Sequence, residues 1–306
     1  MIKFEKQKGN FIKHCPCSPE AISCGYFNLN LHTGCPYSCS YCILQDYLET
    51  KEPIFFTNID DMEKELLRFT KKQKYLRIGT GELSDSLAFD TETKYSNKIL
   101  SIFENFPEVI FEFKTKSINI NSILKYKKVL KNIVVSWSLN PQIIIEREEH
   151  FSPDLNLRLR AIAEVQSKGY KIGLHFDPII LIENWKSYYR SLIVKISKII
   201  NPQNIAWWSM GILRFPHSLR KHIFKFKDSF LFSGELIKGY DGKYRYFKPI
   251  RIEVFKFIRQ EIQSIISDKT PLYLCMEDIE VWEEIFPEIY CTESKINKYL
   301  YESACK

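Results

Sequence analysis

The sequence has no run of eighteen apolar residues, so it lacks the signature of a membrane-spanning helix. No Pro/Gly/Ser-rich stretch marks a linker between domains. The first residues, MIKFEKQKGNFIKHC, lack the apolar core and cleavage site of a signal peptide. We therefore expect a cytoplasmic protein with no membrane partner, whose nine cysteines are ligands or reactive thiols rather than disulfides. The net charge of +7 leaves a polyanionic partner open but supports one only weakly.

Short apolar runs alternate with longer amphipathic stretches, which is the pattern of a parallel sheet wrapped by helices. Expected helices include 58–72, which opens on an Asn cap, and 152–169, which opens on Ser-Pro and closes on Gly. This pattern predicts an α/β fold, a partial (β/α)6 TIM-type barrel with functional residues in the loops after the strands. The six expected strands cover 26–32, 75–80, 109–115, 132–140, 171–179 and 204–212.

The barrel is expected to span residues 28–215, between a Cys-rich N-terminal extension at 1–27 and a C-terminal extension at 216–306. In the C-terminal extension, GYDGKYRYFKP (239–249) has an Asp-Gly turn between aromatic and basic residues, which predicts a hairpin. A helix from about 250 to 267 follows it. We expect this hairpin and helical cap to bind substrate.

A dense cysteine motif follows the first expected strand. The segment GCPYSCSYCILQ (34–45) spaces Cys35, Cys39 and Cys42 as C-x3-C-x2-C. Three thiolates do not complete a structural zinc site, which has four ligands. They do suit a [4Fe–4S] cluster in which one iron stays open to an exogenous ligand. The motif predicts such a cluster.

With this motif the chain resembles the radical S-adenosylmethionine enzymes. The resemblance implies that the open iron binds S-adenosylmethionine, which is reduced to a 5′-deoxyadenosyl radical. It also implies a one-electron reductant of the flavodoxin or ferredoxin type as a partner, and we expect a monomer.

Several further segments resemble the spore photoproduct lyase family, in which an adenosyl radical splits a thymine dimer in damaged DNA. These segments are TGELSDSLAFD (80–90), FEFKTKS (111–117), SWSLNP (136–141), GLHFDPII (173–180) and YLCMEDIEVW (273–282). The resemblance implies that the cofactor is held by Gly79, Thr80, Gly81, Glu82, Lys116, Ser138 and Asn140, with His175 as a further contact. Taken alone, GTGE is also a plain turn, Ser138 and Asn140 could cap a strand end, and His175 with Asp177 could be a hydrogen-bonded barrel-end pair.

The chain departs from the family at the hydrogen-return step. The lyases place a donor cysteine just ahead of the segment that resembles SDSLAFD, but no cysteine lies between Cys42 and Cys275 here. They also flank the third cluster cysteine with two tyrosines, of which Tyr41 is present and the second is replaced by Ile43. Tyr41 and Cys275 are therefore the predicted catalytic residues, with Cys275 as a substitute hydrogen donor. An ordinary core cysteine is the alternative.

Three more cysteines, Cys15, Cys17 and Cys24, lie within ten residues and suit a second metal or Fe–S cluster, with Cys275 or Cys291 as a fourth ligand. In the hairpin, Lys243, Arg245 and Tyr246 are the predicted nucleic-acid contacts, although an amphipathic hairpin would show the same alternation.

Three hypotheses about function remain. The first is lyase-type repair of pyrimidines in DNA. The second is radical modification of a peptide or small metabolite with an auxiliary cluster. The third is a metal-binding adaptor on nucleic acid that has no enzyme activity.

Overall fold

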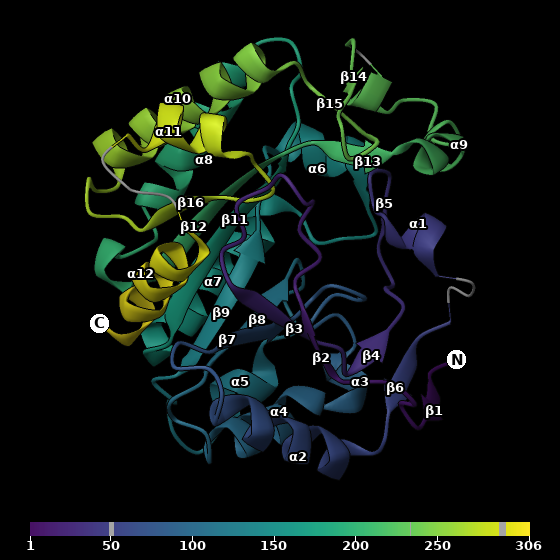
Figure 1. Ribbon diagram of the computed structural model, residues 1–306, viewed down its shortest axis with the longest axis vertical. Coiled ribbons are helices and arrows are strands. Elements are labelled where there is room, and N and C mark those ends of the chain that lie inside the picture. Colours follow the sequence, from purple (N-terminus) through teal and green to yellow (C-terminus); the bar gives the residue numbers. More distant parts are fainter. Residues whose placement is uncertain (49–51, 233, 288–291) are drawn as a thin grey trace.

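The computed structural model describes residues 1–48, 52–232, 234–287 and 292–306, and a curved eight-stranded sheet lies at its centre (Figure 1). The strand order is β16-β12-β11-β9-β8-β7-β3-β2, so the two edges are not paired with each other and the barrel is open. Among the described residues, no helix has the length and apolar character needed to cross a bilayer.

The six predicted strands form the parallel centre of this sheet, in the order of the sequence. Their central residues are buried on both faces, as expected for strands covered by helices on one side and filled by side chains on the other. The strands are β3 (Tyr26–Leu29), β7 (Arg77–Thr80), β8 (Ile110–Thr115), β9 (Ile133–Ser138), β11 (Lys171–Ile179) and β12 (Ile205–Ile212). The α/β partial barrel is thus confirmed.

Two edge strands extend the sheet beyond the prediction. β2 (Ile12–His14) pairs antiparallel with β3, so part of the N-terminal extension belongs to the barrel sheet. β16 (Leu272–Leu274) pairs parallel with β12 at the other edge. The run 273–282 then passes into α11 (Ile279–Ile285), where the Asp278 carboxylate caps the helix by accepting from the Val281 amide at 3.0 Å.

Helices cover the outer face of the sheet (Figure 1). The predicted helix 58–72 is α2 (Ile59–Thr70). The predicted helix 152–169 begins later than expected, because Asp154 rather than Ser-Pro caps α7 (Leu155–Lys168) through the Leu157 amide at 2.9 Å. Gly169 ends it in the left-handed region, at φ +105°. The other helices on this face are α4 (Tyr95–Phe103), α5 (Asn121–Lys125) and α8 (Trp185–Ser197).

The described C-terminal part contains a small sheet and the helices α9 to α12. The predicted hairpin is confirmed as β14 (Ile237–Lys238) and β15 (Lys243–Arg245), and β15 also pairs with β13 (Arg214–Pro216). The predicted helix after it is α10 (Lys248–Ile265), which packs on α8 and α11, while α12 (Glu293–Cys305) packs on β12. Short elements complete the chain: β1 (Lys3–Glu5), β4 (His32–Thr33), β5 (Ser38–Cys39), α1 (Leu44–Tyr47), β6 (Ile54–Phe56), α3 (Asp90–Thr93), α6 (Gln142–Glu148), β10 (Glu149–His150) and α9 (Arg220–Ile223).

A buried carboxylate links the strands inside the barrel. Glu112 of β8 accepts from the Tyr26 hydroxyl at 2.5 Å, from the Trp207 indole at 2.9 Å and from the Ser136 hydroxyl. His175 of β11 lies 2.8 Å from the same carboxylate and 2.7 Å from the hydroxyl of Ser209. Burial opposes the charge of Glu112, but His175 and the hydroxyl donors hold its pKa below the ordinary value. One side chain therefore connects five strands.

We expect Glu112→Ala to lower the free energy of unfolding by about 3–5 kcal/mol at pH 7, because it leaves several buried donors without an acceptor. Urea denaturation monitored by circular dichroism measures this. Glu63→Gln, an exposed substitution on α2, is the control and should change stability by less than about 0.5 kcal/mol. An Ala variant as stable as the control would show that the network does not hold the strands together.

Candidate active site

The three motif cysteines lie on the wall of one cavity of about 610 Å³ at the carboxyl ends of the central strands. The cavity is also lined by Lys114, Thr115 and Lys116 at the end of β8, by Ser138 at the end of β9 and by Asp177 and Pro178 in β11. This is where a barrel of this type carries its functional groups. Of the predicted site residues, the wall holds Cys35, Cys39, Tyr41, Cys42, Gly81, Glu82, Lys116, Ser138 and Lys243.

The cysteine loop is held by the side chain of Gln45 and by the loop after β7. The Gln45 amide donates to the carbonyl oxygens of Cys39, at 2.7 Å, and Ser40, at 3.2 Å. Gly34 has φ +86°, and a Cβ atom there would lie 2.8 Å from the Pro53 Cα, so this position requires glycine. The Ser84 hydroxyl donates to the Gly34 carbonyl at 2.5 Å. These contacts fix the entry and the exit of the loop.

The electrostatic environment of the three thiols is set by burial and by one lysine. Burial raises the pKa of Cys39 and Cys42, and the Lys116 ammonium acts against it at both. Burial also raises the pKa of Cys35, to about 12. Lys116 is itself poised over the ring of Tyr41, 5.8 Å from its centre. A thiolate-ligated metal group would thus have a neighbouring positive charge.

Glu149 is a central residue of the site that the sequence analysis did not identify. Its carboxylate accepts from the Tyr41 hydroxyl at 2.6 Å and from the Asn140 amide at 3.0 Å, and forms a 2.6 Å ion pair with Arg158. Its backbone pairs with Cys39 between β10 and β5. The only sequence signal was an acidic pair, Glu148 and Glu149, at the end of a short helix.

Glu148 supports the same loop from the other side. Its carboxylate accepts from the Ser40 hydroxyl, from the Ser229 hydroxyl at 2.9 Å and from the Phe230 amide. Ser40 lies between Cys39 and Cys42 of the cysteine motif in the sequence. Two consecutive carboxylates therefore fasten the loop to the segment after β9.

Asp85 is a second acidic residue that was missed. It accepts from the Thr115 hydroxyl at 2.5 Å, from the Lys116 amide at 2.6 Å, and from the amides of Leu87 and Ala88 at 3.0 and 2.9 Å. Because it caps its own turn and binds the end of β8, it joins two walls of the cavity. Only its place in SDSLAFD pointed to it.

In the predicted GTGE motif, Gly79 and Thr80 pack against other residues of the fold, whereas Gly81 and Glu82 line the cavity. Gly79 faces the barrel interior, where a Cβ atom would lie 2.0 Å from the Tyr26 hydroxyl oxygen. The Thr80 hydroxyl donates to Ser86 at 2.7 Å. Neither lies on the cavity wall, whereas Gly81, at φ +111°, and Glu82 do. Burial raises the pKa of Glu82, and the amides of Asn30 and Asn28 oppose this. The absent side chain of Gly79 thus makes room for Tyr26 rather than for a ligand.

Two other predicted cofactor contacts lie away from the wall. The Asn140 amide nitrogen donates to Glu149, and its oxygen accepts from the Tyr189 hydroxyl at 3.0 Å, so it supports the Glu149 group. His175 faces Glu112 inside the barrel, which matches the hydrogen-bonded alternative for this histidine. Neither side chain lines the cavity, and each has buried polar partners.

Comparison with known proteins identifies the family. A family model described as spore photoproduct lyase matches residues 18–230, which is more than half of the chain. The chain belongs to the spore photoproduct lyase family. This is a family of radical S-adenosylmethionine enzymes, so the predicted resemblance is confirmed.

Named members of the family are similar along much of their length. The spore photoproduct lyase of Clostridium acetobutylicum is 26% identical over 269 residues, covering 84% of this chain and 78% of that protein. The Bacillus subtilis enzyme is 26% identical over 176 residues, covering 56% of this chain and 51% of that protein. A solved mutant of spore photoproduct lyase with dinucleoside spore photoproduct has a TM-score of 0.78 at 20% identity, covering 90% and 82% of the two chains. Another solved mutant, with bound AdoMet and dinucleoside spore photoproduct, has a TM-score of 0.75 at 20% identity, covering 89% and 81%. At this identity the two structures show a common fold.

Cys275 is the predicted hydrogen donor. Its side chain is half-buried and does not line the cavity. Its sulfur lies 3.6 Å from Arg214 Nη2, and Arg214 forms a 3.2 Å ion pair with Asp177. Arg214, Asp177 and the neighbouring Met276 do line the cavity. The predicted role of Cys275 as hydrogen donor therefore stays a prediction, because its thiol does not line the cavity but contacts Arg214, which does.

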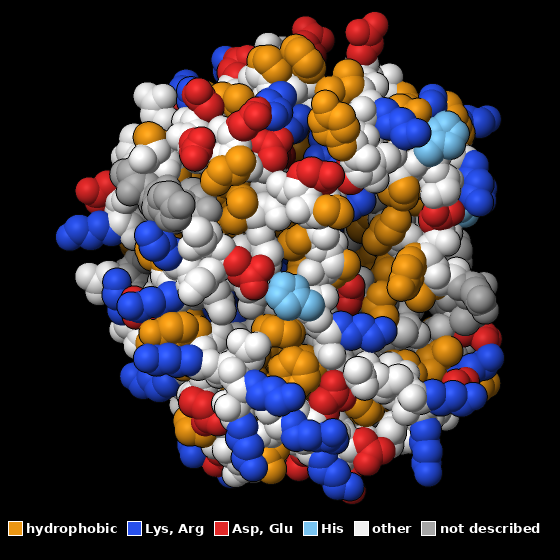
Figure 2. All heavy atoms as spheres, in the orientation of Figure 1, with side chains coloured by type: hydrophobic (Ala, Val, Ile, Leu, Met, Phe, Trp, Pro, Cys, Tyr) orange, Lys and Arg blue, Asp and Glu red, His pale blue; other side chains and the backbone are white. Residues whose placement is uncertain are grey.

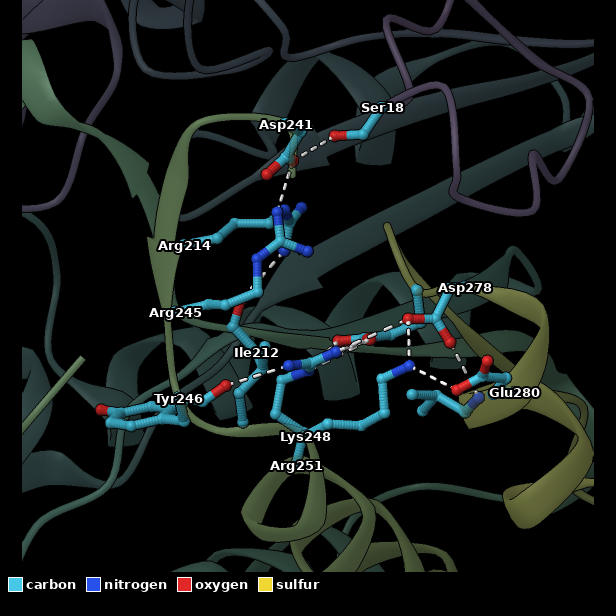
Figure 3. Close-up of polar contacts among 12 residues, drawn as sticks. Ser18, Ile212, Arg214, Asp241, Arg245, Tyr246, Lys248, Arg251, Asp278 and Glu280 are labelled. Carbon is cyan, nitrogen blue, oxygen red and sulfur yellow. Dashed lines mark hydrogen bonds and ion pairs between the residues drawn. The ribbon is translucent and has the colours of Figure 1, made fainter. Parts of the chain in front are cut away.

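The predicted nucleic-acid contacts of the hairpin are directed inward (Figure 3). Tyr246 is only 7% exposed and its hydroxyl accepts from the Leu181 amide at 3.0 Å, so it is not available for stacking on a base. Arg245 forms an ion pair with Asp241, and Lys243 donates to Ser18 at 3.1 Å. Lys243 also lines the cavity, so the predicted contact of Lys243 and Arg245 with nucleic acid stays a prediction.

Other groups of the same region do face solvent. Figure 2 shows Lys and Arg side chains around α9, with hydrophobic side chains prominent over the neighbouring hairpin. Tyr240, at the hairpin turn, is 99% exposed, and Phe224 after α9 is 63% exposed. An outward basic surface with exposed aromatic rings thus lies beside the cavity, although the predicted residues do not form it.

Proposed function

We propose that this protein binds a [4Fe–4S] cluster through Cys35, Cys39 and Cys42 and uses it with S-adenosylmethionine to repair spore photoproduct in DNA. The observation that carries the proposal is the single cavity on which these three thiols meet Glu82, Lys116 and Ser138. The donor set fits the group, because three soft thiolates hold a cluster and leave one iron open. One-electron cleavage of the cofactor is the chemistry that this group supplies when bound.

The chain's own residues then bind and orient the cofactor. The wall at Gly81 has no side chain, so a ligand can approach the backbone there. The neighbouring Glu82 carboxylate is suited to accept from an amino group, and Ser138 offers a hydroxyl across the cavity. Asp85 binds the backbone of Lys116 and fixes this part of the wall. The same wall includes Lys114 and Arg214, whose charges suit the phosphate of a dinucleotide.

The family membership favours DNA repair over the peptide and metabolite hypothesis. The two solved structures described above hold dinucleoside spore photoproduct on the same fold. In this chain Tyr41 lies on the cavity wall, as a member of the hydrogen relay should, and its hydroxyl donates to Glu149. The usual donor cysteine is absent, and Ile43 replaces the second tyrosine. The relay of this protein therefore differs from that of the family.

The test is an anaerobic repair assay with a reductant and S-adenosylmethionine, on a dinucleotide spore photoproduct and on a duplex that carries the same lesion. Repair of the dinucleotide is expected, with the thymidine dinucleotide, its phosphodiester intact, as product. We expect Tyr240→Ala to weaken duplex binding about tenfold, because a lost stacking contact costs about 1–3 kcal/mol, and to leave dinucleotide repair unchanged. Tyr188→Ala, on α8, is the matched exposed control.

Two outcomes would contradict this proposal. Cofactor cleavage without repair of either substrate would reject the lyase activity and favour another radical substrate. Equal duplex affinity for Tyr240→Ala and Tyr188→Ala would reject the hairpin turn as a DNA contact. Duplex affinity should also fall steeply with salt, because phosphate contacts release counterions.

A further inference from the structure

Four cysteines from the two ends of the chain come together at the edge of the cavity. The segment with Cys15, Cys17 and Cys24 runs beside the residues that follow β16, where the Ile22 amide donates to the Glu277 carbonyl at 2.9 Å. Ala21 and Asp278 form an antiparallel bridge in the same place. These contacts bring the N-terminal trio next to Cys275. The other predicted fourth ligand, Cys291, lies outside the described residues.

The sulfur atoms are near one another. The Cys15 thiol hydrogen-bonds Cys17, and this bond raises the pKa of Cys15, together with burial and the proximity of Cys275 and Cys24. Burial is the main cause that raises the pKa of Cys275 above its ordinary value, and the nearby Cys24 raises it further. The group is thus one set of four thiols rather than four isolated cysteines. All four residues are only half-buried, unlike ordinary core cysteines.

Cations surround these thiols. Arg214 Nη2 lies 3.6 Å from the Cys275 sulfur, and Arg77 Nη2 donates to the Cys24 carbonyl at 2.5 Å. Lys243 is held beside Cys17 by its bond to Ser18, and Figure 3 shows Ser18 meeting the hairpin at Asp241. A group of thiolates and metal carries net negative charge, so these cations suit it. The Asp177 carboxylate, which contacts Cys275, is paired with Arg214.

The positions of the four thiols bear on whether they would bind a single zinc ion or an iron–sulfur cluster. In the described ranges no three His, Cys, Asp or Glu side chains converge on the position of a single metal ion. A zinc ion needs such convergence, with about 2.3 Å from each sulfur. An iron–sulfur cluster has a separate iron for each thiolate, so its ligands lie spread around it. Four thiolates are a ligand set that a [4Fe–4S] cluster can use, with one thiolate for each iron.

We propose that Cys15, Cys17, Cys24 and Cys275 bind a second iron–sulfur cluster at the rim of the cavity. Pro16 and Met276, which are sequence neighbours of three of these ligands, both line the cavity wall. The second cluster would therefore lie beside the substrate rather than at a distant surface. It is independent of the substrate proposed above, and it assigns Cys275 a ligand role in place of hydrogen donation.

The test uses a variant in which Cys35, Cys39 and Cys42 are all alanine, so that only the second site remains. After anaerobic reconstitution with iron and sulfide, the unmutated chain should hold about eight irons and this variant about four. Adding Cys24→Ser and Cys275→Ser together leaves only Cys15 and Cys17, too few to hold a cluster, and should lower the iron content of the variant to below about one per chain. Adding Cys305→Ser, at an exposed cysteine, is the matched control and should leave about four.

Iron content of about four in the unmutated chain and none in the triple variant would overturn the second cluster. Zinc without sulfide in the triple variant would also overturn it. Cys15→Ser with Cys17→Ser, made in the same background, repeats the measurement without any change in β16 or the residues that follow it. Cys24→Ser with Cys275→Ser in the otherwise unmutated chain should keep about four irons and still cleave S-adenosylmethionine, so loss of the second cluster is distinguished from failure of the first. If this double variant keeps all its iron, the ligand assignment is wrong, and radical by-products from Cys275→Ser alone in the repair assay would identify Cys275 as the hydrogen donor.

Discussion

Replacement of Cys35, Cys39 or Cys42 by alanine is expected to abolish cleavage of S-adenosylmethionine. Three thiolates are the minimum that holds the cluster and leaves one iron open. Each single replacement leaves only two thiolates, so we expect loss of the cluster rather than weaker binding. Changes in the second coordination shell of metal sites already cost about 10–100-fold, and we expect a loss of more than about 100-fold here. The measurement is 5′-deoxyadenosine formed anaerobically with a chemical reductant.

Cys305→Ala is the control for this prediction, because Cys305 is exposed near the C-terminus and does not line the cavity. It should form 5′-deoxyadenosine at the unmutated rate. Each cavity variant should also keep its far-ultraviolet circular dichroism spectrum, so that loss of activity is not confused with unfolding. Full activity in any one of the three variants would remove the radical mechanism from consideration.

Glu149→Ala is expected to destabilise the protein by about 3–5 kcal/mol and to prevent retention of the cluster. The substitution leaves Arg158 in the interior without its partner, and a single charge in a buried pair is costly. It also frees the Tyr41 hydroxyl and the Asn140 amide, which Glu149 holds beside the cysteine loop. Urea denaturation measures the first effect, and iron content after gel filtration measures the second.

The Glu149 contribution should depend on pH in one direction. Burial raises the pKa of this carboxyl, but Arg158 and Lys116 outweigh burial and lower it to about 2. The unfolded carboxyl has a pKa of about 4.3, so the stabilisation is complete above that value and is lost as the pH falls toward 2. The difference in stability between the unmutated chain and Glu149→Gln should therefore shrink in acid.

Glu146→Gln, one helical turn earlier and exposed, provides the control for both measurements. It should leave stability within about 0.5 kcal/mol of the unmutated value. If Glu149→Ala matches this control in stability and iron content, the carboxylate does not position the loop.

The barrel and its cysteine loop could be predicted from the sequence because their signals are local. Each central strand is a short apolar run, and the three cysteines lie within eight residues. The edge strands were harder, because β2 and β16 each have three residues and their pairing is decided by chain segments far away. The start of α7 was misplaced for a local reason, since Ser152, Pro153 and Asp154 are all plausible starts and only the Asp154 bond distinguishes them.

The site was less predictable because its residues depend on contacts across the fold. Glu149 and Asp85 have ordinary acidic sequence contexts, and their roles follow from partners that meet only in the folded barrel. Gly79 and Gly81 look equivalent in GTGE, yet Gly79 lies within β7 and packs against Tyr26, whereas Gly81 follows the strand at φ +111° and lines the cavity. Alternation of basic and aromatic residues in the hairpin could not show which side faces solvent, and Tyr246 faces inward.

The meeting of the N-terminal cysteines with the segment after β16 also constrains how the protein is made. Ile22 and Glu277 are separated by more than 250 residues, so their contact forms only after nearly the whole chain has left the ribosome. Chains emerge N-terminus first at about 5–20 residues per second, which leaves Cys15, Cys17 and Cys24 without Cys275 for more than about ten seconds. During synthesis these three thiols are therefore exposed to cellular oxidants and metal ions before their fourth neighbour exists.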